Sequence, residues 1–192
     1  MIGRVKFATF FVARARTRCP QIPELADVGK RLSDEGLAGG NFGNMSIRYG
    51  RGMVITATNV SLGSLSDDDV GEVRDYDPVR NVAIAIGLQQ PSSETPMHWM
   101  IYRAFPETGA VIHVHGSSKG VETEKELPPG SLELGMEAFG SLKGHNPITL
   151  KNHGPVAKGY TLEDALHRLT LDENVGKEMK MERDRKRVGG KR

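Results

Sequence analysis

Two histidines separated by one residue form the most chemically suggestive pattern in this sequence. His113 and His115 lie in the run Ala110-Val111-Ile112-His113-Val114-His115-Gly116, whose composition predicts a β-strand. Side chains alternate between the two faces of a strand, so both imidazoles project to one side and Ile112 and Val114 to the other. Imidazole is a common ligand of zinc. The spacing therefore indicates a metal site, although hydrogen-bonded structural histidines show the same pattern.

A third histidine, His153, lies far downstream in Asn152-His153-Gly154, directly after a short apolar segment. Catalytic zinc sites typically have three protein ligands and an open position for water or substrate. The three histidines match that count, and nickel, cobalt, iron or manganese could use the same ligands. Glu94 stands just before a predicted helix and offers a carboxylate for metal-assisted catalysis. His98, on that helix, is expected to pack near the site rather than to bind metal.

Two polar segments could hold an anionic group. Residues 91–96, Pro-Ser-Ser-Glu-Thr-Pro, stand at a predicted helix start, where backbone N–H groups and hydroxyls favour an anion. Alternatively, Ser93 or Thr95 is the helix cap and Glu94 complements the helix dipole, and these residues alone favour that simpler interpretation. Residues 40–46, Gly-Asn-Phe-Gly-Asn-Met-Ser, could expose N–H groups to a phosphate. They match neither a Walker loop nor a dinucleotide fingerprint, so an ordinary turn is the alternative.

The predicted elements alternate between helices and strands. Hydrophobic spacing predicts a helix over 22–35 that Gly36 ends, a second that opens at Pro96, a third over 132–142, and a fourth over 162–186 capped by Thr161. The expected strands are 45–49, 52–56, 82–86, 110–116 and 147–150. This interleaving favours a layered α/β or α+β domain.

Bulk composition is that of an ordinary globular chain. The 192 residues fit one domain with a sizeable core, and 38% are hydrophobic and 26% charged. A single cysteine, Cys19, excludes an internal disulfide and favours a reducing, cytoplasmic setting. No apolar run reaches the length that spans a bilayer, so we expect no membrane partner. The apolar stretch 7–12 is followed by three arginines without a cleavage site, which does not match a signal peptide.

Charge divides the chain into three expected parts. Residues 1–20 form a basic extension with five basic and no acidic residues, and residues 177–192 form a basic tail with eight basic and three acidic residues. The predicted catalytic domain, residues 21–176, holds 13 basic and 21 acidic residues. An acidic body with basic ends is not typical of a nucleic-acid binder, so we expect no such partner. The tail could contact a polyanion, but a solvated, fraying helix is the simpler interpretation.

Taken in order, five segments resemble the class II aldolase and adducin head-domain family. The matching segments span roughly residues 22–170. They are residues 40–48, residues 55–59 with 65–70, residues 91–94 with His98 and Tyr102, residues 110–115, and residues 150–159 with 162–165. The resemblance implies a single three-layer α/β/α domain around a mainly antiparallel central sheet. It also implies a homotetramer with active sites between subunits.

The same resemblance implies roles for individual residues. One zinc ion per subunit would be held by His113, His115 and His153, and Glu94 would be the catalytic acid/base. The residues expected to line a phosphate pocket are Asn44, Thr58, Asn59, Ser92 and Ser93. Such a set fits an aldehyde-lyase that cleaves or forms a carbon–carbon bond in a phosphorylated ketose, giving dihydroxyacetone phosphate and an aldehyde such as lactaldehyde. Zinc would polarise the ketone, the carboxylate would move a proton, and phosphate binding would fix the reacting carbons.

The sequence departs from the family pattern at two places. Asn59 stands where the phosphate turn usually has glycine. No tyrosine occurs between Gly116 and Pro147, the stretch from which a family aldolase supplies a tyrosine to the neighbouring subunit. A sugar-phosphate 4-epimerase or a dehydratase that uses the same metal site is therefore an alternative function. A non-catalytic, adducin-like interaction module is a third.

Overall fold

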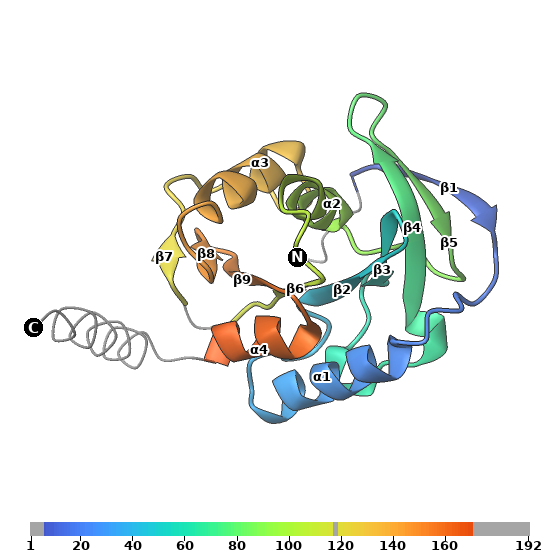
Figure 1. Ribbon diagram of the computed structural model, residues 1–192, viewed down its shortest axis with the longest axis horizontal. Coiled ribbons are helices and arrows are strands. Elements are labelled where there is room, and N and C mark those ends of the chain that lie inside the picture. The colour runs from blue at the N-terminus through green and yellow to red at the C-terminus, as the bar shows by residue number, and fades with distance from the viewer. Residues whose placement is uncertain (1–5, 117–118, 171–192) are drawn as a thin grey trace, which may run out of the picture.

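A nine-stranded mixed sheet organises the chain (Figure 1). The computed structural model describes residues 6–116 and 119–170. The strands are β1 (Ala8–Ala13), β2 (Asn44–Tyr49), β3 (Gly52–Thr56), β4 (Val70–Asp77), β5 (Val82–Ile86), β6 (Ala110–His113), β7 (Val121–Glu122), β8 (Ile148–Leu150) and β9 (Gly154–Gly159). Their order in the sheet is β1-β5-β4-β3-β2-β6-β9-β8-β7. The β1–β5 and β7–β8 pairs are parallel and the other pairs are antiparallel, which confirms a mainly antiparallel sheet.

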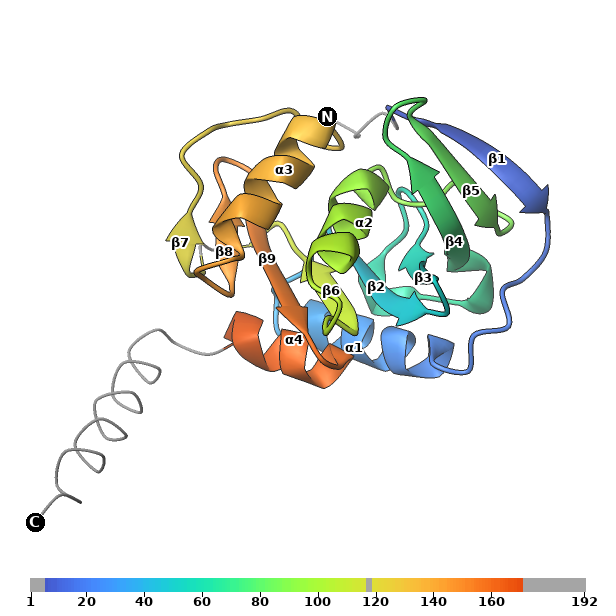
Figure 2. The ribbon, with the colours of Figure 1, turned by 45° about the horizontal axis from the view of Figure 1, so that its top comes forward.

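Helices cover both faces of this sheet, as Figures 1 and 2 show. On one face lie α1 (Ile22–Asp34) and α4 (Leu162–Thr170), and on the other lie α2 (Thr95–Ala104) and α3 (Leu132–Ser141). Two short 3₁₀ helices, Leu62–Ser64 and Asp67–Asp69, connect β3 to β4. The expected three-layer α/β/α arrangement is confirmed. Among the described helices, none has the length and apolar character needed to cross a membrane.

Two hydrophobic clusters form the core, one on each face of the sheet. Ile112 and Val114 belong to the cluster under α1 and α4, whereas Val111 belongs to the cluster under α2 and α3. This is the alternation expected of a strand. It places His113, two residues after Val111, on the α2 side of the sheet. All four residues are buried, so the central strand β6 fixes the position of the first histidine of the pattern.

Several predicted boundaries match the structure closely. Strands β3 and β5 occupy the predicted ranges, and α1 ends at Asp34, two residues before Gly36 with its positive φ of 72°. The predicted strand 110–116 is wrong at its end, because β6 stops at His113 and His115 lies beyond it. The predicted helix 162–186 begins as expected, with the Thr161 hydroxyl accepting from the Asp164 amide at 3.1 Å. Its part beyond residue 170 lies outside the described residues, as does the basic tail.

Besides the two-residue strand β7, which was also not predicted, three strands carry weak sequence signals and were missed. In β4, acidic residues and a glycine obscure the apolar alternation, and β9 is short and contains Pro155 and two glycines. The third, β1, lies within the predicted basic extension and pairs with β5 at the edge of the sheet. Residues 8–13 therefore belong to the sheet rather than to a separate extension. An edge strand has a partner on one side only, so its exposed side chains give no clear periodicity.

Candidate active site

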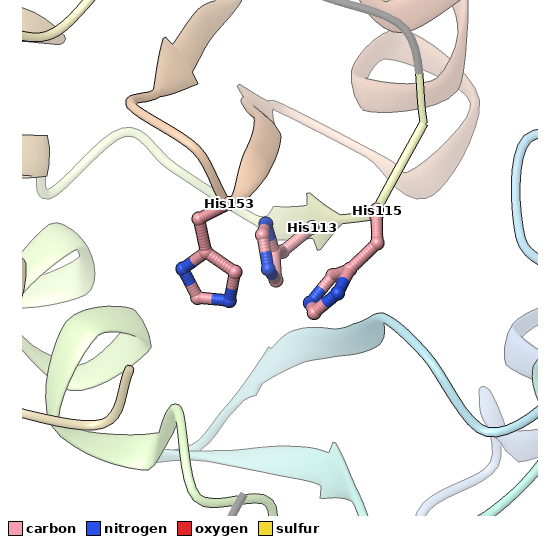
Figure 3. A group of neighbouring side chains, drawn as sticks. All are labelled: His113, His115 and His153. Carbon is pink, nitrogen blue, oxygen red and sulfur yellow. The ribbon is translucent and has the colours of Figure 1, made fainter. Parts of the chain in front are cut away.

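His113, His115 and His153 converge on one point (Figure 3). One ring nitrogen from each lies within 4.8 Å of those of the other two. The ring centroids are 4.6–4.9 Å apart. His113 is the last residue of β6, His115 follows it, and His153 lies in the turn between β8 and β9. The predicted triad is therefore brought together by segments that are far apart in the sequence.

Strand pairing explains how His153 reaches the other two histidines. Strand β9 runs antiparallel to β6 with Val156 opposite His113, so the turn that precedes β9 meets the end of β6. Gly154 permits this approach, because a Cβ atom there would lie 2.2 Å from the Val114 carbonyl oxygen. Its φ of 140° also falls in a region that favours glycine. The absence of a side chain at Gly154 thus allows the turn that contains His153 to pack against the end of β6.

The histidines present the chemistry that a divalent metal requires. The His113 Nδ1 lies 3.0 Å from the Pro155 carbonyl oxygen, which assigns the proton to Nδ1 and leaves the Nε2 lone pair free. That Nε2 is buried and has no hydrogen-bond partner among the described residues. Burial lowers the pKa of His113 well below its usual value, and burial with the nearby His115 lowers the pKa of His153 to about 4. Neutral imidazoles with a buried free nitrogen fit a metal ligand set.

Glu94 is the acidic group beside this triad. It is the N-cap residue of α2, its side chain is only 3% exposed, and its Oε1 lies 4.0 Å from the His153 Nε2. Its Oε2 is buried without a partner among the described residues. Burial raises the pKa of Glu94 to about 7, against a smaller lowering by the backbone of Gly130. A buried carboxyl group with a pKa near neutrality is suited to proton transfer.

The start of α2 is not capped by Ser93 or Thr95, the residues that the simpler interpretation of the sequence predicted. The Ser92 hydroxyl accepts from the Glu94 amide at 3.2 Å, and the Thr95 hydroxyl donates to the Ser92 carbonyl at 2.7 Å. Glu94 occupies the cap position but makes no side-chain capping bond. The expectation that Ser93 or Thr95 caps the helix is therefore wrong. The Glu94 carboxyl group is left free to face the histidines.

A pocket of about 510 Å³ joins His115 and His153 to the predicted phosphate-binding residues. Backbone hydrogen bonds join the two loops that form one wall of the pocket, the loop after β3 and the loop before α2. The Thr58 amide donates to the Gln90 carbonyl at 2.9 Å, and the Ser92 amide donates to the Thr56 carbonyl at 3.0 Å. On the other side, Asn44 begins β2 opposite His113, with its Oδ1 buried and without a partner among the described residues. Residues that line the pocket include Asn44, Thr58, Asn59, Ser92, Ser93, Glu94, His115 and His153.

Comparison with known proteins agrees with this geometry. Residues 23–119, half of the chain, match the Class II Aldolase and Adducin N-terminal domain. The chain belongs to the class II aldolase and adducin family. It is 32% identical over 168 residues to an L-fuculose phosphate aldolase of Methanocaldococcus jannaschii, with 77% of this chain and 89% of that protein covered. The predicted family resemblance is thereby confirmed.

Relatives within the family carry more than one reaction name. A methylthioribulose-1-phosphate dehydratase of Enterobacter sp. is 38% identical over 135 residues, covering 68% of this chain and 64% of that protein. Among solved structures, an L-fuculose 1-phosphate aldolase has the same fold, with a TM-score of 0.69, 22% identity and 91% of each chain covered. Membership of the class II aldolase family therefore leaves the individual reaction to be argued from the site.

Asn59 stands where the family resemblance led us to expect glycine, and it has a positive φ. Its φ is 61°, in the left-handed region that glycine adopts freely. Asparagine is among the non-glycine residues that enter this region at modest cost. The backbone at Asn59 therefore has a conformation that the expected glycine would also adopt. Among the described residues, no tyrosine lines the pocket of the single subunit.

Two contacts of the site were not predicted. The Phe42 ring stacks on the His115 ring with a centroid separation of 5.4 Å. Gly130, in a Pro-Pro-Gly turn, brings its backbone to Glu94. The sequence signals a turn at each place, through glycines around Phe42 and through Pro128-Pro129-Gly130. Neither signal says which side chain of the site the turn meets, because the contacts depend on the tertiary fold.

His98 packs directly behind the site, as expected, and it is fully buried. Its Nδ1 lies 2.7 Å from the Ser46 hydroxyl, which in turn lies 2.9 Å from the Tyr102 hydroxyl. Burial lowers the pKa of His98 to about 3, so the imidazole is neutral. His98 is not part of the histidine group that could hold a metal. It forms the layer between α2 and β2 that supports the pocket.

Proposed function

We propose that this chain is a zinc-dependent lyase that cleaves or forms a carbon–carbon bond in a phosphorylated ketose. The products of cleavage would be dihydroxyacetone phosphate and an aldehyde such as lactaldehyde. The observation that carries the proposal is the joint pocket: three converging histidines and a buried Glu94 at one end, and a cluster of hydroxyl and amide side chains at the other. Family membership supports the same reaction class.

The polar end of the pocket is suited to the substrate phosphate. Thr58, Ser92 and Ser93 offer hydroxyl groups, and Asn44 and Asn59 offer amide groups. The start of α2 adds the positive end of a helix dipole beside Ser92. None of these groups has to be deprotonated to bind an anion. Holding the phosphate here would fix the adjacent carbon chain against the histidines and lower the entropic cost of reaching the transition state.

The three histidines would hold the metal, and Glu94 would move the proton. When bound, a divalent cation supplies Lewis-acid stabilisation of the oxygen that gains negative charge as the carbon–carbon bond breaks. Glu94, whose Oε1 lies 4.0 Å from the His153 Nε2, would deliver a proton to the ketose-derived carbon or remove one in the direction of synthesis. Its burial excludes bulk water from that step. His113 would keep its orientation through the Pro155 carbonyl throughout.

A non-catalytic interaction module fits these observations poorly. Burying a carboxyl group and several imidazoles without partners costs free energy that binding alone does not require. Glu94 and His113 each have a buried atom without a hydrogen-bond partner in the described part of the chain. Such groups cluster at functional sites because the chemistry needs them there. We therefore favour an enzyme over the adducin-like alternative.

A dehydratase is the second candidate, and one observation favours it. The pocket has no tyrosine among the described residues, so the lyase needs another donor for the aldehyde oxygen. A neighbouring subunit of the proposed homotetramer could supply one. A dehydratase would abstract a substrate proton and release a substrate hydroxyl group with it as water, while the same three histidines would hold the metal that activates the substrate. The relative named as a methylthioribulose-1-phosphate dehydratase supports this alternative. The 4-epimerase alternative has no comparable observation in its favour.

Product analysis separates the candidates. The full chain, loaded with zinc, would be incubated with a series of phosphorylated ketoses, and products would be quantified by mass spectrometry and by coupled reduction of dihydroxyacetone phosphate. The proposal predicts two fragments in equal amounts. A single product lighter by one water molecule would replace the lyase with the dehydratase, and a product of unchanged mass would indicate the epimerase. Chain treated with a chelator serves as the control and should give no product.

A further inference from the structure

The three histidines of the proposed metal site are held in unequal ways. His113 is buried and hydrogen-bonded to the Pro155 carbonyl, and His153 packs beside the buried Glu94. His115 is exposed and lies past the end of β6. Within residues 6–116 and 119–170, no hydrogen bond involves the His115 ring. Metal-binding histidines usually have such a bond, which fixes the ring orientation. His115 therefore needs another means of orientation.

The ring of Phe42 provides the contact that His115 lacks. The two rings lie 5.4 Å apart between centroids, with an interplanar angle of 26°, which is the geometry of an offset stack. Phe42 lines the pocket, and 53% of the residue is exposed. It belongs to neither hydrophobic core cluster of the described chain. An exposed phenylalanine outside the core has little packing role, so its contact with His115 is its clearest contribution.

Glycine at position 43 makes this contact geometrically available. Gly43 has a φ of 93°, and a Cβ atom there would lie 2.8 Å from the His113 carbonyl oxygen and 3.3 Å from the Val114 Cα. The turn from Gly40 to Gly43 can therefore press against the end of β6. Phe42, one residue earlier, is carried to the open side of His115. The backbone conformation of this turn therefore brings the Phe42 ring to the His115 ring.

We infer that Phe42 is a positioning residue that holds the His115 ring in the orientation required to bind metal. The inference rests on the proposed metal site and adds a residue to it. Phe42 would act through His115 and would not touch the metal. Removing an outer contact of a metal-binding histidine typically weakens metal affinity by about 10–100-fold. A single stacking contact at a partly exposed site should have an effect near the lower end of this range, so we expect Phe42→Ala to lower metal affinity about 10-fold.

Zinc affinity, measured by chelator competition on the full chain, tests this inference. Phe42→Ala should weaken zinc binding about 10-fold and change the visible spectrum of the cobalt-substituted protein, whereas Phe42→Tyr, which retains the ring, should restore both. Phe10→Ala is the matched control, because Phe10 is 64% exposed on β1 and does not line the pocket. It should leave affinity and spectrum unchanged. Thermal unfolding of the metal-free variants shows whether each is folded.

The outcomes separate this inference from the function on which it rests. Wild-type chain that binds zinc, together with Phe42→Ala of equal affinity and identical cobalt spectrum, would overturn the role of Phe42 and leave the metal site intact. A Phe42→Tyr variant as weak as Phe42→Ala would also overturn it, because the ring would then not be the cause. Wild-type chain that binds no zinc would overturn both.

Discussion

The two halves of the pocket are built by different means. The inner half, His113, His153 and Glu94, is buried and attached to the end of a central strand, to the turn before β9 and to the start of α2. The outer half, Phe42, His115 and Asn59, lies on turns and is more open to solvent. Glycines or a residue with positive φ shape the outer turns, whereas strand pairing and burial fix the inner half.

This difference shows where the chemistry is fixed and where the pocket can vary. Regular elements hold side chains more precisely than loops do, so the inner half gives firm positions to the proposed proton-transfer group and to two of the three proposed metal ligands. The inner half also carries a free-energy cost, because its imidazole and carboxyl groups are buried with few partners. The outer half has a smaller desolvation cost because its side chains are more exposed. It depends on turns with positive φ, which a single substitution can destabilise.

The largest effect is expected from the inner half, at Glu94. Glu94→Gln keeps the shape of the side chain but removes the proton that it exchanges, so turnover should fall by about 100- to 10,000-fold. Zinc content should stay at the wild-type level, because Glu94 is not one of the three grouped ligands. Steady-state kinetics with elemental analysis would measure both. Glu133→Gln, an exposed carboxylate on α3, is the control, and an equal loss of turnover there would remove the special role of Glu94.

The boundary between the halves should be sensitive at Gly43. Gly43→Ala places a Cβ against the His113 carbonyl oxygen and strains a φ of 93°, so it should lower the free energy of unfolding by about 1–3 kcal/mol. The expected fall in Tm is roughly 3–10 °C, measured by thermal unfolding. Gly39→Ala is a matched control four residues away, where a Cβ meets no atom within 4 Å and φ is not positive. Equal Tm values for the two variants would contradict the account of this turn.

The smallest effect concerns acid stability of the layer behind the inner half. Burial lowers the pKa of His98 to about 3 in the folded chain, whereas in the unfolded chain its pKa has the ordinary histidine value of 6.5. Between pH 6.5 and pH 3, the unfolded state therefore binds a proton at His98 that the folded state does not bind. The contribution of His98 to the free energy of unfolding is fully present above pH 6.5 and is lost as the pH falls toward 3. One such group makes the free energy of unfolding fall by about 1.4 kcal/mol per pH unit.

Urea unfolding of zinc-free protein at several pH values would measure this dependence. His98→Asn removes the titrating group and should give a shallower pH dependence than the wild type, even if the variant is less stable overall. The other buried imidazoles, above all His113, remain in both proteins and supply the residual slope. Parallel pH curves for the wild type and His98→Asn would show that His98 does not titrate as described.

The inner half could be predicted from the sequence better than the outer half. The strand pattern placed His113 on β6, and helix start signals placed Glu94 just before α2. His115, in the outer half, was expected on the same strand but lies beyond its end. His153 was expected from the ligand count of catalytic zinc sites, and the family resemblance added the phosphate-pocket residues. The structure groups the three histidines and places His115, His153, Glu94 and the expected phosphate residues around one cavity. Local sequence rules suffice here because the groups sit at the ends of regular elements.

The remaining features depend on tertiary contacts that no local pattern encodes. The Phe42 stack and the Gly130 contact with Glu94 arise where turns meet distant elements. Strand β1 was placed in an extension because its pairing with β5 joins residues more than 70 positions apart. Strand β9 was missed because Pro155 weakens its strand signal, yet it carries the carbonyl group that orients His113. These long-range features could be seen only once the fold was known.

Zinc titration of the chelator-treated full chain is the most direct test of the account. The lyase activity identified by product analysis would be followed as zinc is added in fractions of one equivalent per chain. The account predicts no activity without metal and a linear rise that stops at one equivalent, with the titration abolished in His113→Ala. Full activity of the metal-free chain would contradict it.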